Sequence, residues 1–502
     1  MTRPSLPWAV LPSVRAWPLH NALATRGIEA RAIADAPPHA LMQRAGLAVA
    51  RLALAVAPTA RSAWIAAGPG NNGGDGLVAA VHLRAAGWRV SVSLLADPLR
   101  LPFDAAWALD QARAAGVAIS ADPAPSGPVD LAIDALLGLG SSRAPSGDLA
   151  VAVGRLNSLA SPVLSIDLPT GLCGDRGRLL GDEAVRAEHT LSLLTLKPGL
   201  FTAQGRDHAG RVWWDDLSVE ASDAPPTATL VGPPPRRVPL HSRHKGSQGD
   251  LIVLGGAPGM GGAALLAARA GLAAGAGRVY LARLDGNPAD IDPARPELMP
   301  RAPADILVPA SLASSTVVCG CGGGVAVRQW LPRVLHHAAR LVLDADALNA
   351  ISEDSGLEAM LRQRAGRRLP TVLTPHPLEA ARLLRTETGA VQFDRPSNAV
   401  AMAARLGCHV VLKGSGTLLA SPEGIWCINP TGNARLATAG TGDVLAGWLG
   451  GLWATQPDAA PLHLAGQAVW QHGRAAEDGP ADRPMRAADL IEAMVGTSAV
   501  LA

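Results

Sequence analysis

The sequence of 502 residues is poor in cysteine and shows almost no excess of charge. Its five cysteines are an odd number with no metal-site spacing beyond one Cys-x-Cys, so neither a disulfide framework nor a cysteine-based metal site is expected. The formal net charge of +2 gives no basic excess. We therefore expect no nucleic-acid partner.

Long apolar runs are also missing. The two most apolar segments, residues 41–60 and 263–282, are each interrupted by two arginines, so no membrane-spanning helix is expected. Prolines and Arg15 break the first 19 residues where a signal peptide would need an apolar core. These absences predict a cytoplasmic protein with no membrane partner.

The chain is long, at 502 residues, and 48% of these residues are hydrophobic. A chain of this size is too long for one ordinary core, which predicts two or three domains. Prolines and small residues accumulate without periodicity over residues 221–239. We expect a first domain over residues 1–222, a linker over 223–238 and a second domain over 239–502. Alternating strand-like, glycine-rich and helix-like stretches predict an α/β fold for both domains.

In the first half, a helix is predicted over residues 40–54 and a strand over residues 62–67. A glycine loop over residues 68–76 follows, and then a helix over residues 77–86. This order is typical of an open α/β sheet, whose ligands lie beyond the carboxyl ends of the strands. Amide and carboxylate oxygens in such a loop suit a ribose, a hydroxyl-bearing ring or a hard monovalent cation.

Two later strands of this half each end with an aspartate, Asp134 or Asp167. Acids at this edge face the ligand crevice, so both are expected to meet Asn72 and Asp75 of the glycine loop. Either acid alone could instead cap the next helix.

The same glycine loop contains Gly68-x-Gly70-x-x-Gly73, and Asp97 follows about where a nicotinamide dehydrogenase carries its ribose-binding carboxylate. A nicotinamide dehydrogenase is therefore an alternative for this half. It does not account for the second half.

The second half centres on residues 437–443, a run of small residues that leads into an apolar pattern of helical spacing. Such a turn presents unpaired backbone N–H groups that attract an anion, for instance a transferring phosphoryl group. Asp443 is an acid within this turn, and we expect it to act as a general base that takes a proton from an attacking hydroxyl. The alternative is a simple helix cap.

Other strand ends of this half carry two carboxylates over residues 341–349, then His376, and then Lys413. No G-x-x-x-x-G-K-[ST] is present, which excludes a Walker-type site. Lys413 and the four residues after it could instead hold a nucleotide phosphate.

The chain resembles the bifunctional NAD(P)H-hydrate repair enzymes over nearly its whole length. The first half is similar to their epimerase domain through LMQRAG (residues 41–46), GPGNNGGDG (68–76), DALLGLGSSR (134–143) and DLPTG (167–171). The second half is similar to their ADP-dependent dehydratase domain through HKGSQG, GGAPGMGGA, DADALN, LTPHPLEA, LKGSGT and NPTGNARLATAGTGDVLAG. The resemblance implies an N-terminal Rossmann-like three-layer sandwich and a C-terminal ribokinase-like α/β domain.

The implied function is repair of hydrated NADH and NADPH (NADHX and NADPHX). The first domain would exchange the R and S forms at C6. The second would dehydrate the S form with ADP as phosphoryl donor, together with Mg²⁺, and release AMP and phosphate. A potassium ion in the epimerase domain and a homo-oligomer are also implied. The alternative is a small-alcohol or vitamin-precursor kinase fused to a non-catalytic nucleotide-binding domain, which would leave a stable phosphorylated product.

The resemblance also implies a role for particular residues. In the first domain the substrate-binding residues would be Asn71, Asn72, Gly73, Gly74, Asp75, Gly138, Leu139, Gly140, Ser141, Ser142, Arg143, Ala144 and Asp167. The potassium ligands would be Asn72, Asp134 and Thr170. In the second domain the substrate would contact Ala263, Gly322, His376 and Asp443, with Asp443 catalytic. The nucleotide would contact Lys413, Gly414, Ser415, Gly416, Thr417 and Gly442.

Two points stay open within this assignment. Either Asp134 or Asp167 could assist epimerisation. The family usually carries Gly-Pro-Gly-Leu-Gly where this chain has Gly320-Cys321-Gly322-Gly323-Gly324, which leaves the contact made by that loop undefined.

Overall fold

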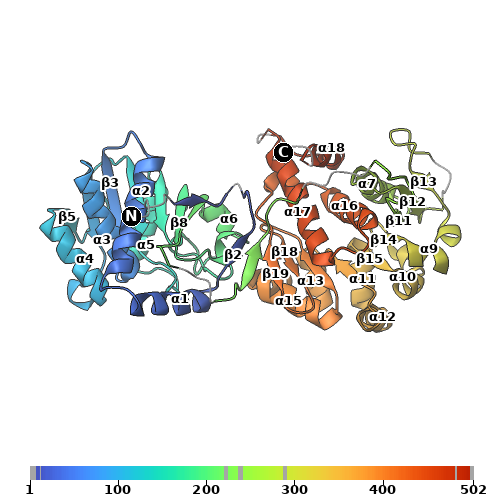
Figure 1. The fold of residues 1–502 in the computed structure, drawn as a ribbon, viewed down its shortest axis with the longest axis horizontal. Coiled ribbons are helices and arrows are strands. Elements are labelled where there is room, and N and C mark those ends of the chain that lie inside the picture. Colours follow the sequence, from blue (N-terminus) through green and yellow to red (C-terminus); the bar gives the residue numbers. More distant parts are fainter. Residues whose placement is uncertain are drawn as a thin grey trace. The chain divides into compact units, whose positions relative to one another are not determined.

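The computed structural model describes residues 7–11, 13–219, 224–235, 241–286, 291–480 and 483–497. The chain divides into two compact units, Met1–Thr229 and Leu230–Ala502 (Figure 1). The division falls inside the stretch expected as a linker. That stretch contains a short strand, β10 (Ala228–Leu230), which is too short to produce a periodic pattern.

A sheet of eight strands forms the first unit, in the order β1-β9-β8-β7-β6-β3-β4-β5. All neighbouring pairs are parallel except β1 with β9. From β3 the chain first moves to β4 on one side and later to β6 on the other. The boundary between β3 and β6 is therefore a switch point, where open α/β sheets bind ligands. The strands are β1 (Trp8–Ala9), β3 (Ser62–Ala67), β4 (Arg89–Leu94), β5 (Ala118–Ser120), β6 (Leu131–Ala135), β7 (Val163–Ile166), β8 (His189–Leu193) and β9 (Arg211–Asp215), with β2 (Trp17–Leu19) outside this sheet.

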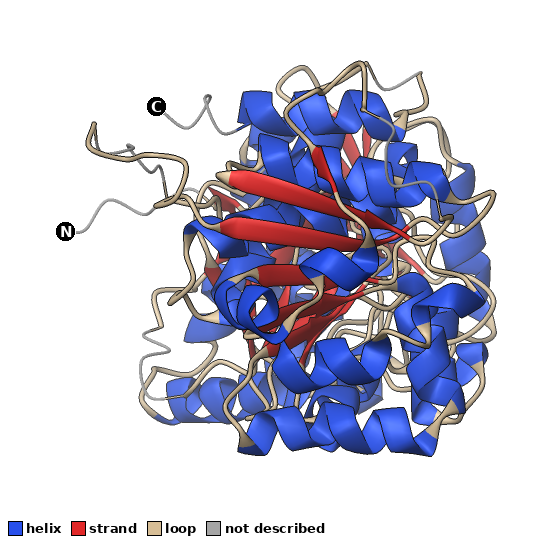
Figure 2. Ribbon diagram, turned by 90° about the vertical axis from the view of Figure 1, so that its right-hand side faces the viewer, coloured by secondary structure: helices blue, strands red, loops and turns tan. Residues whose placement is uncertain are grey.

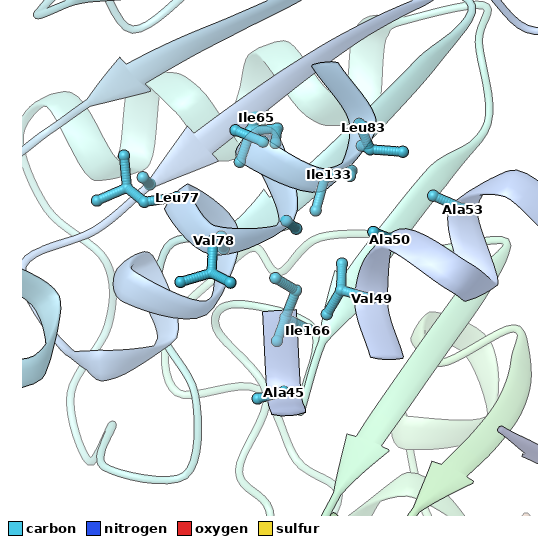
Figure 3. Close-up of a cluster of buried hydrophobic side chains, with 14 of the residues drawn as sticks. Ala45, Val49, Ala50, Ala53, Ile65, Leu77, Val78, Leu83, Ile133 and Ile166 are labelled. Atoms are coloured by element: carbon cyan, nitrogen blue, oxygen red, sulfur yellow. The ribbon is translucent and has the colours of Figure 1, made fainter. Parts of the chain in front are cut away.

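Helices cover both faces of this sheet, as the alternation of side chains along β3 shows. Ile65 packs in the cluster of α2, α3 and α4, and Figure 3 draws it with Val49 of α2 and Leu77 of α3. Trp64 packs in a second cluster with Val153 and Leu156 of α5. Successive strand residues face opposite sides, so the unit has the expected three layers. The helices are α1 (Ala22–Ala34), α2 (Ala40–Val56), α3 (Asn71–Ala85), α4 (Phe103–Ala114), α5 (Asp148–Ser158) and α6 (Gly205–His208), with short η1 (Pro98–Arg100) and η2 (Pro198–Leu200).

The sheet of the second unit runs β13-β12-β11-β14-β15-β16-β17-β18-β19, with β10 next to β19. Pairing is parallel from β13 to β17 and antiparallel from β17 to β19. Parallel strands that alternate with helices bury both faces of a sheet. The strands are β11 (Asp250–Gly255), β12 (Arg278–Arg283), β13 (Met299–Pro300), β14 (Thr316–Cys319), β15 (Arg340–Leu343), β16 (Thr371–Leu373), β17 (His409–Leu412), β18 (Leu418–Ala420) and β19 (Trp426–Ile428).

Helices α7, α16, α17 and α18 pack on one face of this sheet, around a core that includes Val318 and Trp448. Helices α7 and α16 approach closely because Gly447 has no side chain: a Cβ there would lie 2.0 Å from the carbonyl oxygen of Ala267. Strands (red) and flanking helices (blue) are distinguished in Figure 2. The helices are α7 (Gly261–Ala273), α8 (Pro303–Ile306), α9 (Pro309–Ser314), α10 (Leu331–His337), α11 (Ala345–Glu353), α12 (Ser355–Gly366), α13 (Pro377–Leu384), α14 (Thr388–Phe393), α15 (Arg395–Leu406), α16 (Thr441–Thr455), α17 (Pro461–Glu477) and α18 (Ala487–Thr497), with short η3 (Val325–Val327) and η4 (Ala434–Leu436).

The expected fold class of two α/β units is confirmed, but the expected start of one helix is wrong. Helix α3 begins at Asn71 and not at residue 77, so most of the predicted glycine loop is helical. Glycine weakens a helix in isolation. Here Gly73 lets the helix start pack against Gly68, whose oxygen would lie 2.2 Å from an added Cβ. The two carboxylates expected at a strand end follow β15, which stops at Leu343: Asp344 is the N-cap of α11 and Asp346 lies in its first turn.

Within the described residues, no helix is both long and apolar enough to cross a membrane. The expected location and homo-oligomer stay predictions.

Candidate active sites

The first candidate site lies at the switch point between β3 and β6. The β3–α3 turn passes so close to β6 that a Cβ on Gly68 would lie 1.8 Å from the carbonyl oxygen of Leu136. This contact places the first turns of α3 beside the loop that follows β6. At Gly138 in that loop, an added Cβ would lie 3.1 Å from Asn72 Oδ1 and 3.3 Å from Asp167 Oδ2. The predicted meeting of Asn72 and Asp167 is thus observed.

A cavity of about 740 Å³ opens at this point. Most of the substrate-binding residues expected for the first domain line it: Asn71, Asn72, Asp75, Gly138, Leu139, Gly140, Ser141, Ser142, Arg143, Ala144 and Asp167. Gly73 and Gly74 do not. Gly73 packs on Gly68, and a Cβ on Gly74 would lie 2.4 Å from Met42 Cε. These two glycines allow close packing below the cavity.

Asp167 is fixed by three donors. The Leu139 N–H donates to its Oδ2 at 3.1 Å, the Leu193 N–H lies 3.4 Å from Oδ1, and the ammonium of Lys197 forms an ion pair with Oδ1. The backbone of Asp167 has φ +66°, in the left-handed region that costs energy for residues other than glycine. Such a conformation is characteristic of sites where geometry is imposed by function.

Lys197 is a site residue that the sequence reasoning missed. It is 1% exposed, and its ammonium also donates to the carbonyl oxygen of Leu193 at 2.7 Å. The available signal was a lysine four residues after the apolar strand β8. Its partner Asp167 stands 30 residues earlier in the chain, so no local pattern connects the two.

Asp134 lies beneath the cavity and not in its lining. It accepts from Ser165 Oγ at 2.8 Å, Thr170 N at 2.9 Å, Thr170 Oγ1 at 2.7 Å and Leu136 N at 3.2 Å. Burial raises the pKa of Asp134, although these four donors oppose the shift. Its hydrogen bonds connect the ends of β6 and β7.

The expected potassium ligands are chemically compatible with a monovalent cation. Asn72, Asp134 and Thr170 offer an amide, a carboxylate and a hydroxyl oxygen, the hard donors that such an ion prefers. The Nδ2 of Asn72 is buried and has no hydrogen-bond partner among the described residues. The Oδ1 of Asn72 lies on the side of Gly138, 3.1 Å from where a Cβ on that glycine would be.

Two further acids, both half-buried, line the same cavity. Burial and the nearby charges of Asp167, Glu29 and Asp104 raise the pKa of Asp75 well above its usual value. Burial and Asp167 also raise the pKa of Glu29. Glu29 comes from α1, where the sequence showed no motif. The cavity therefore combines a carboxylate held by an ammonium with two acids whose pKa values are raised.

Asp97, the acid required by the dehydrogenase alternative, is exposed and lies outside the cavity lining. It accepts from Leu99 N at 3.0 Å and caps η1. The glycine loop thus lacks the ribose-binding carboxylate of a nicotinamide dehydrogenase at the expected position.

The second candidate site lies at the first turn of α16. The helix begins at Thr441 after Gly440, whose φ of +88° allows the chain to turn into the helix. Asp443 is its third residue, so its carboxylate and the unpaired N–H groups share one turn. The loop that becomes a helix was predicted correctly at this place.

The ammonium of Lys413 reaches this turn. It lies 2.8 Å from Asp344 Oδ1 and 3.9 Å from Glu379 Oε2, and a Cβ on Gly442 would lie 3.3 Å from it. Although burial opposes the charged form, Asp344 and Glu379 raise the pKa of Lys413 above its usual value. Lys413 is thus a fixed cation beside the first turn of α16.

Asp443 has an unusual environment for an acid at a helix start. Burial and the charge of Asp344 raise its pKa to about 6, against the opposing effects of Cys321 and Lys413. A carboxyl group with this pKa is ionised at neutral pH and still accepts a proton readily, which suits a general base.

The remaining residues predicted for the second site lie at three places. Ala263 and Gly322 are adjacent, since a Cβ on Gly322 would lie 2.8 Å from Ala263 Cβ. His376 is exposed and caps α13, its Nδ1 accepting from Leu378 N at 3.2 Å and Glu379 N at 3.3 Å. The predicted nucleotide segment after Lys413 continues with exposed Gly414 and Ser415 and the half-buried Gly416 and Thr417.

The sequence reasoning missed two other groups at this site. The thiol of Cys321 lies with the carboxylates of Asp344 and Asp443, their ligand atoms within 4.8 Å of one another. His472 of α17 donates from Nε2 to the carbonyl oxygen of Thr441 at 2.9 Å. Burial lowers the pKa of His472 to about 4, so it is neutral at physiological pH.

Comparisons with known proteins cover both units. The family described as YjeF-related protein N-terminus matches residues 38–199, and the family described as NAD(P)H-hydrate dehydratase matches residues 251–495. The bifunctional NAD(P)H-hydrate repair enzyme of Leishmania braziliensis is 36% identical over 501 residues, covering 90% of this chain and 88% of its own. Its namesake from Escherichia coli is 34% identical over 477 residues, covering 92% and 87%.

Among solved structures, an ADP/ATP-dependent NAD(P)H-hydrate dehydratase from Bacillus subtilis, co-crystallized with ATP and Mg²⁺, is 28% identical. It covers 53% of this chain and 94% of its own, with a TM-score of 0.43. The identity and coverage of the full-length relatives, together with the two matched families, show that the chain belongs to the bifunctional NAD(P)H-hydrate repair enzymes.

Proposed function

We propose that the first unit exchanges the R and S forms of hydrated NADH and NADPH, and that the second dehydrates the S form with ADP. The observation that carries the dehydratase part is the place of Asp443, a poised base in the same helix turn as the anion-binding N–H groups. Membership of the repair family supports both activities.

In the dehydratase step, Asp443 accepts the proton of the C6 hydroxyl as its oxygen attacks the terminal phosphorus of ADP. The N–H groups of residues 440–442 and the ammonium of Lys413 stabilise the negative charge of the phosphoryl group in transfer. AMP leaves. The ring nitrogen then donates its electron pair, the C6–O bond breaks and inorganic phosphate departs. Loss of a proton from C5 of the resulting iminium re-forms the C5–C6 double bond and restores the reduced nicotinamide.

Nucleotide binding is proposed for Lys413, Gly414, Ser415, Gly416, Thr417 and Gly442, and substrate contact for Ala263, Gly322 and His376. Mg²⁺ would accompany ADP, held mainly by the oxygens of the nucleotide phosphates, and would neutralise their charge.

In the epimerase step, we favour Asp167 over Asp134 as the acting acid. Asp167 lines the cavity, whereas Asp134 lies beneath it with four hydrogen bonds. Asn72, Asp134 and Thr170 would hold a potassium ion, whose positive charge would favour the ionised form of Asp134. Comparing the rate of R-to-S exchange in Asp134→Ala and Asp167→Ala tests this choice. Normal exchange in both variants would refute it.

The function as a whole is tested by incubating the full chain with an R/S mixture of hydrated NADH and either ADP or ATP. We expect recovery of the NADH absorbance band and one inorganic phosphate per NADH. With ADP the second product is AMP. Accumulation of a stable phosphorylated compound would instead identify a small-alcohol kinase.

A further inference from the structure

Arg395 is a buried cation beside the segment proposed for nucleotide binding. It is the first residue of α15 and only 2% exposed. Burial lowers the pKa of its guanidinium to about 10, so the group is still charged at neutral pH. Among the residues that the structure describes, no acid forms an ion pair with it, and its Nε has no hydrogen-bond partner. A buried charge without an acid, at the positive end of a helix, is unfavourable.

The guanidinium holds the backbone where the nucleotide segment begins. Its Nη2 donates to the carbonyl oxygens of Leu412 and Lys413, each at 3.3 Å, and its Nη1 donates to Gln392 Oε1 at 2.9 Å. Strand β17 ends at Leu412 and is parallel to β16. These two carbonyls therefore lie at the carboxyl end of a parallel strand, the edge where α/β sheets bind ligands.

Gly414 allows this close approach. A Cβ there would lie 2.8 Å from Arg395 Nη1 and 3.0 Å from Nη2. The φ of Gly414 is +134°, a conformation that favours glycine. Gly414 is itself exposed. The guanidinium thus lies directly behind an accessible stretch of backbone.

The contact with Arg395 also sets the direction of a peptide group. In a trans peptide the C=O and the N–H point in opposite directions. Because the carbonyl of Lys413 accepts from Arg395, the N–H of Gly414 points away from the buried guanidinium. The next carbonyl, that of Gly414, accepts from Thr417 Oγ1 at 3.1 Å. Backbone N–H groups directed outward from such a loop are suited to binding phosphate oxygens.

We propose that Arg395 is a positioning residue for the nucleotide: it holds the Lys413 carbonyl inward, so that the Gly414 N–H faces the phosphates of ADP. This inference rests on the proposed nucleotide site at residues 413–417. A planar guanidinium can donate to two neighbouring carbonyls at once, which an ammonium on a flexible stem does less well. Its positive charge behind Gly414 also favours an anionic ligand.

Arg364 of α12 provides a matched control. It is 1% exposed, and burial lowers its pKa to about 10 as well. Its guanidinium donates to the carbonyl oxygens of Leu335 and Ala338 and to Thr371 Oγ1, each at 2.8 Å. Thr371 is the first residue of β16, so Arg364 lies at the opposite edge of the sheet from the nucleotide segment. Its replacement removes a comparable buried cation without touching that segment.

The test measures the dissociation constant of ADP with Mg²⁺ by calorimetry on the full chain, and the KM for hydrated NADH at saturating ADP. For Arg395→Met we expect ADP to bind about tenfold more weakly, with the KM for hydrated NADH unchanged. Arg395→Lys, which keeps the charge but not the planar donors, should bind ADP with intermediate affinity. Arg364→Met and Arg364→Lys should bind ADP as wild type does.

Thermal unfolding first establishes which variants fold, and Arg395→Lys keeps the test decisive if the methionine variant does not. Wild-type affinity for ADP in a folded Arg395 variant would overturn the inference, as would an equal loss in the Arg364 variants. A wild-type protein that binds ADP but forms no NADH from the hydrate would overturn the dehydratase function instead. The two failures are distinguishable because ADP binding is measured without the hydrate.

Discussion

The two units each place an acid within the first turns of a helix that faces a candidate site. Asp75 lies in α3 and Asp443 in α16. The N-terminal end of a helix favours a negative charge. The pKa of each acid is nevertheless raised, in both cases by burial and by neighbouring carboxylates. Burial and like charge therefore outweigh the helix dipole at both sites.

The neighbours decide how far each pKa moves. Asp75 is surrounded by Asp167, Glu29 and Asp104, and its pKa is raised well above the usual value. Asp443 has the opposing influence of Cys321 and Lys413, and its pKa reaches about 6. Similar local geometry thus has a different outcome in the two units: the charged form of Asp75 is opposed by every neighbouring charge, whereas that of Asp443 is partly stabilised by Cys321 and Lys413. Pairs of this kind are how enzymes separate acid and base roles.

The largest effect should come from removing the cation of the first site. Lys197→Met leaves the largely buried Asp167 carboxylate without its partner. We expect a loss of about 3–5 kcal/mol in the free energy of unfolding of this unit. Denaturant unfolding measures it, and Lys197→Met combined with Asp167→Asn should recover most of the loss. Equal stability of Lys197→Met and wild type would show that the ion pair does not hold the site.

The next effect concerns the base of the second site. Asp443→Asn keeps the shape of the side chain but cannot accept the proton. We expect dehydratase turnover to fall by roughly 10²-fold or more, with nucleotide binding nearly intact. Turnover with saturating ADP and a nucleotide binding isotherm measure the two quantities. Unchanged turnover would remove Asp443 from the proposed role.

A smaller effect follows from the pKa of Asp443. Its folded value of about 6 lies above the ordinary 3.8, so the folded state binds this proton more tightly. The stability that the carboxyl group contributes is present below about pH 4 and is lost as pH rises through 6. Asp443→Asn should therefore be more stable than wild type at pH 8, by about 1–2 kcal/mol given partial solvent exposure. Below pH 4 the difference should vanish. A difference independent of pH would contradict this account.

The smallest effect is expected at Asp75. The raised pKa of Asp75 means that its surroundings disfavour the charged form, so the neutral amide of asparagine should lose little favourable charge there. Asp75→Asn should change the free energy of unfolding at pH 7 by less than about 1 kcal/mol. Thermal and denaturant unfolding compare it with Asp443→Asn. A large stabilisation by Asp75→Asn would mean that Asp75 is ionised, and the contrast between the two acids would fail.

Much of both sites could be predicted because their residues follow strands of parallel sheets. Because the ends of β3, β6 and β7 converge by topology, the sequence alone predicts that Asn72 and Asp167 lie close together. The start of α16 could also be predicted, because small residues give way to an apolar helical pattern at Gly440.

The rest depends on contacts between distant segments. The run Asn71 to Gly76 looks like a loop by propensity, and tight packing of Gly73 and Gly74 makes it helical. Lys197 and Cys321 stand out only when Asp167 and Asp443 are placed beside them. Local patterns carry no information about such partners, so single residues that act through a distant neighbour were missed.

The most direct test of the account starts from the pure R form of hydrated NADH, supplied with ADP to the full chain. If the first unit exchanges epimers and the second dehydrates the S form, NADH should appear after conversion through the S form. With Asp443→Asn, R and S forms should still interconvert while almost no NADH appears. NADH formation without any nucleotide, or undiminished formation by Asp443→Asn, would contradict the division of work between the two sites.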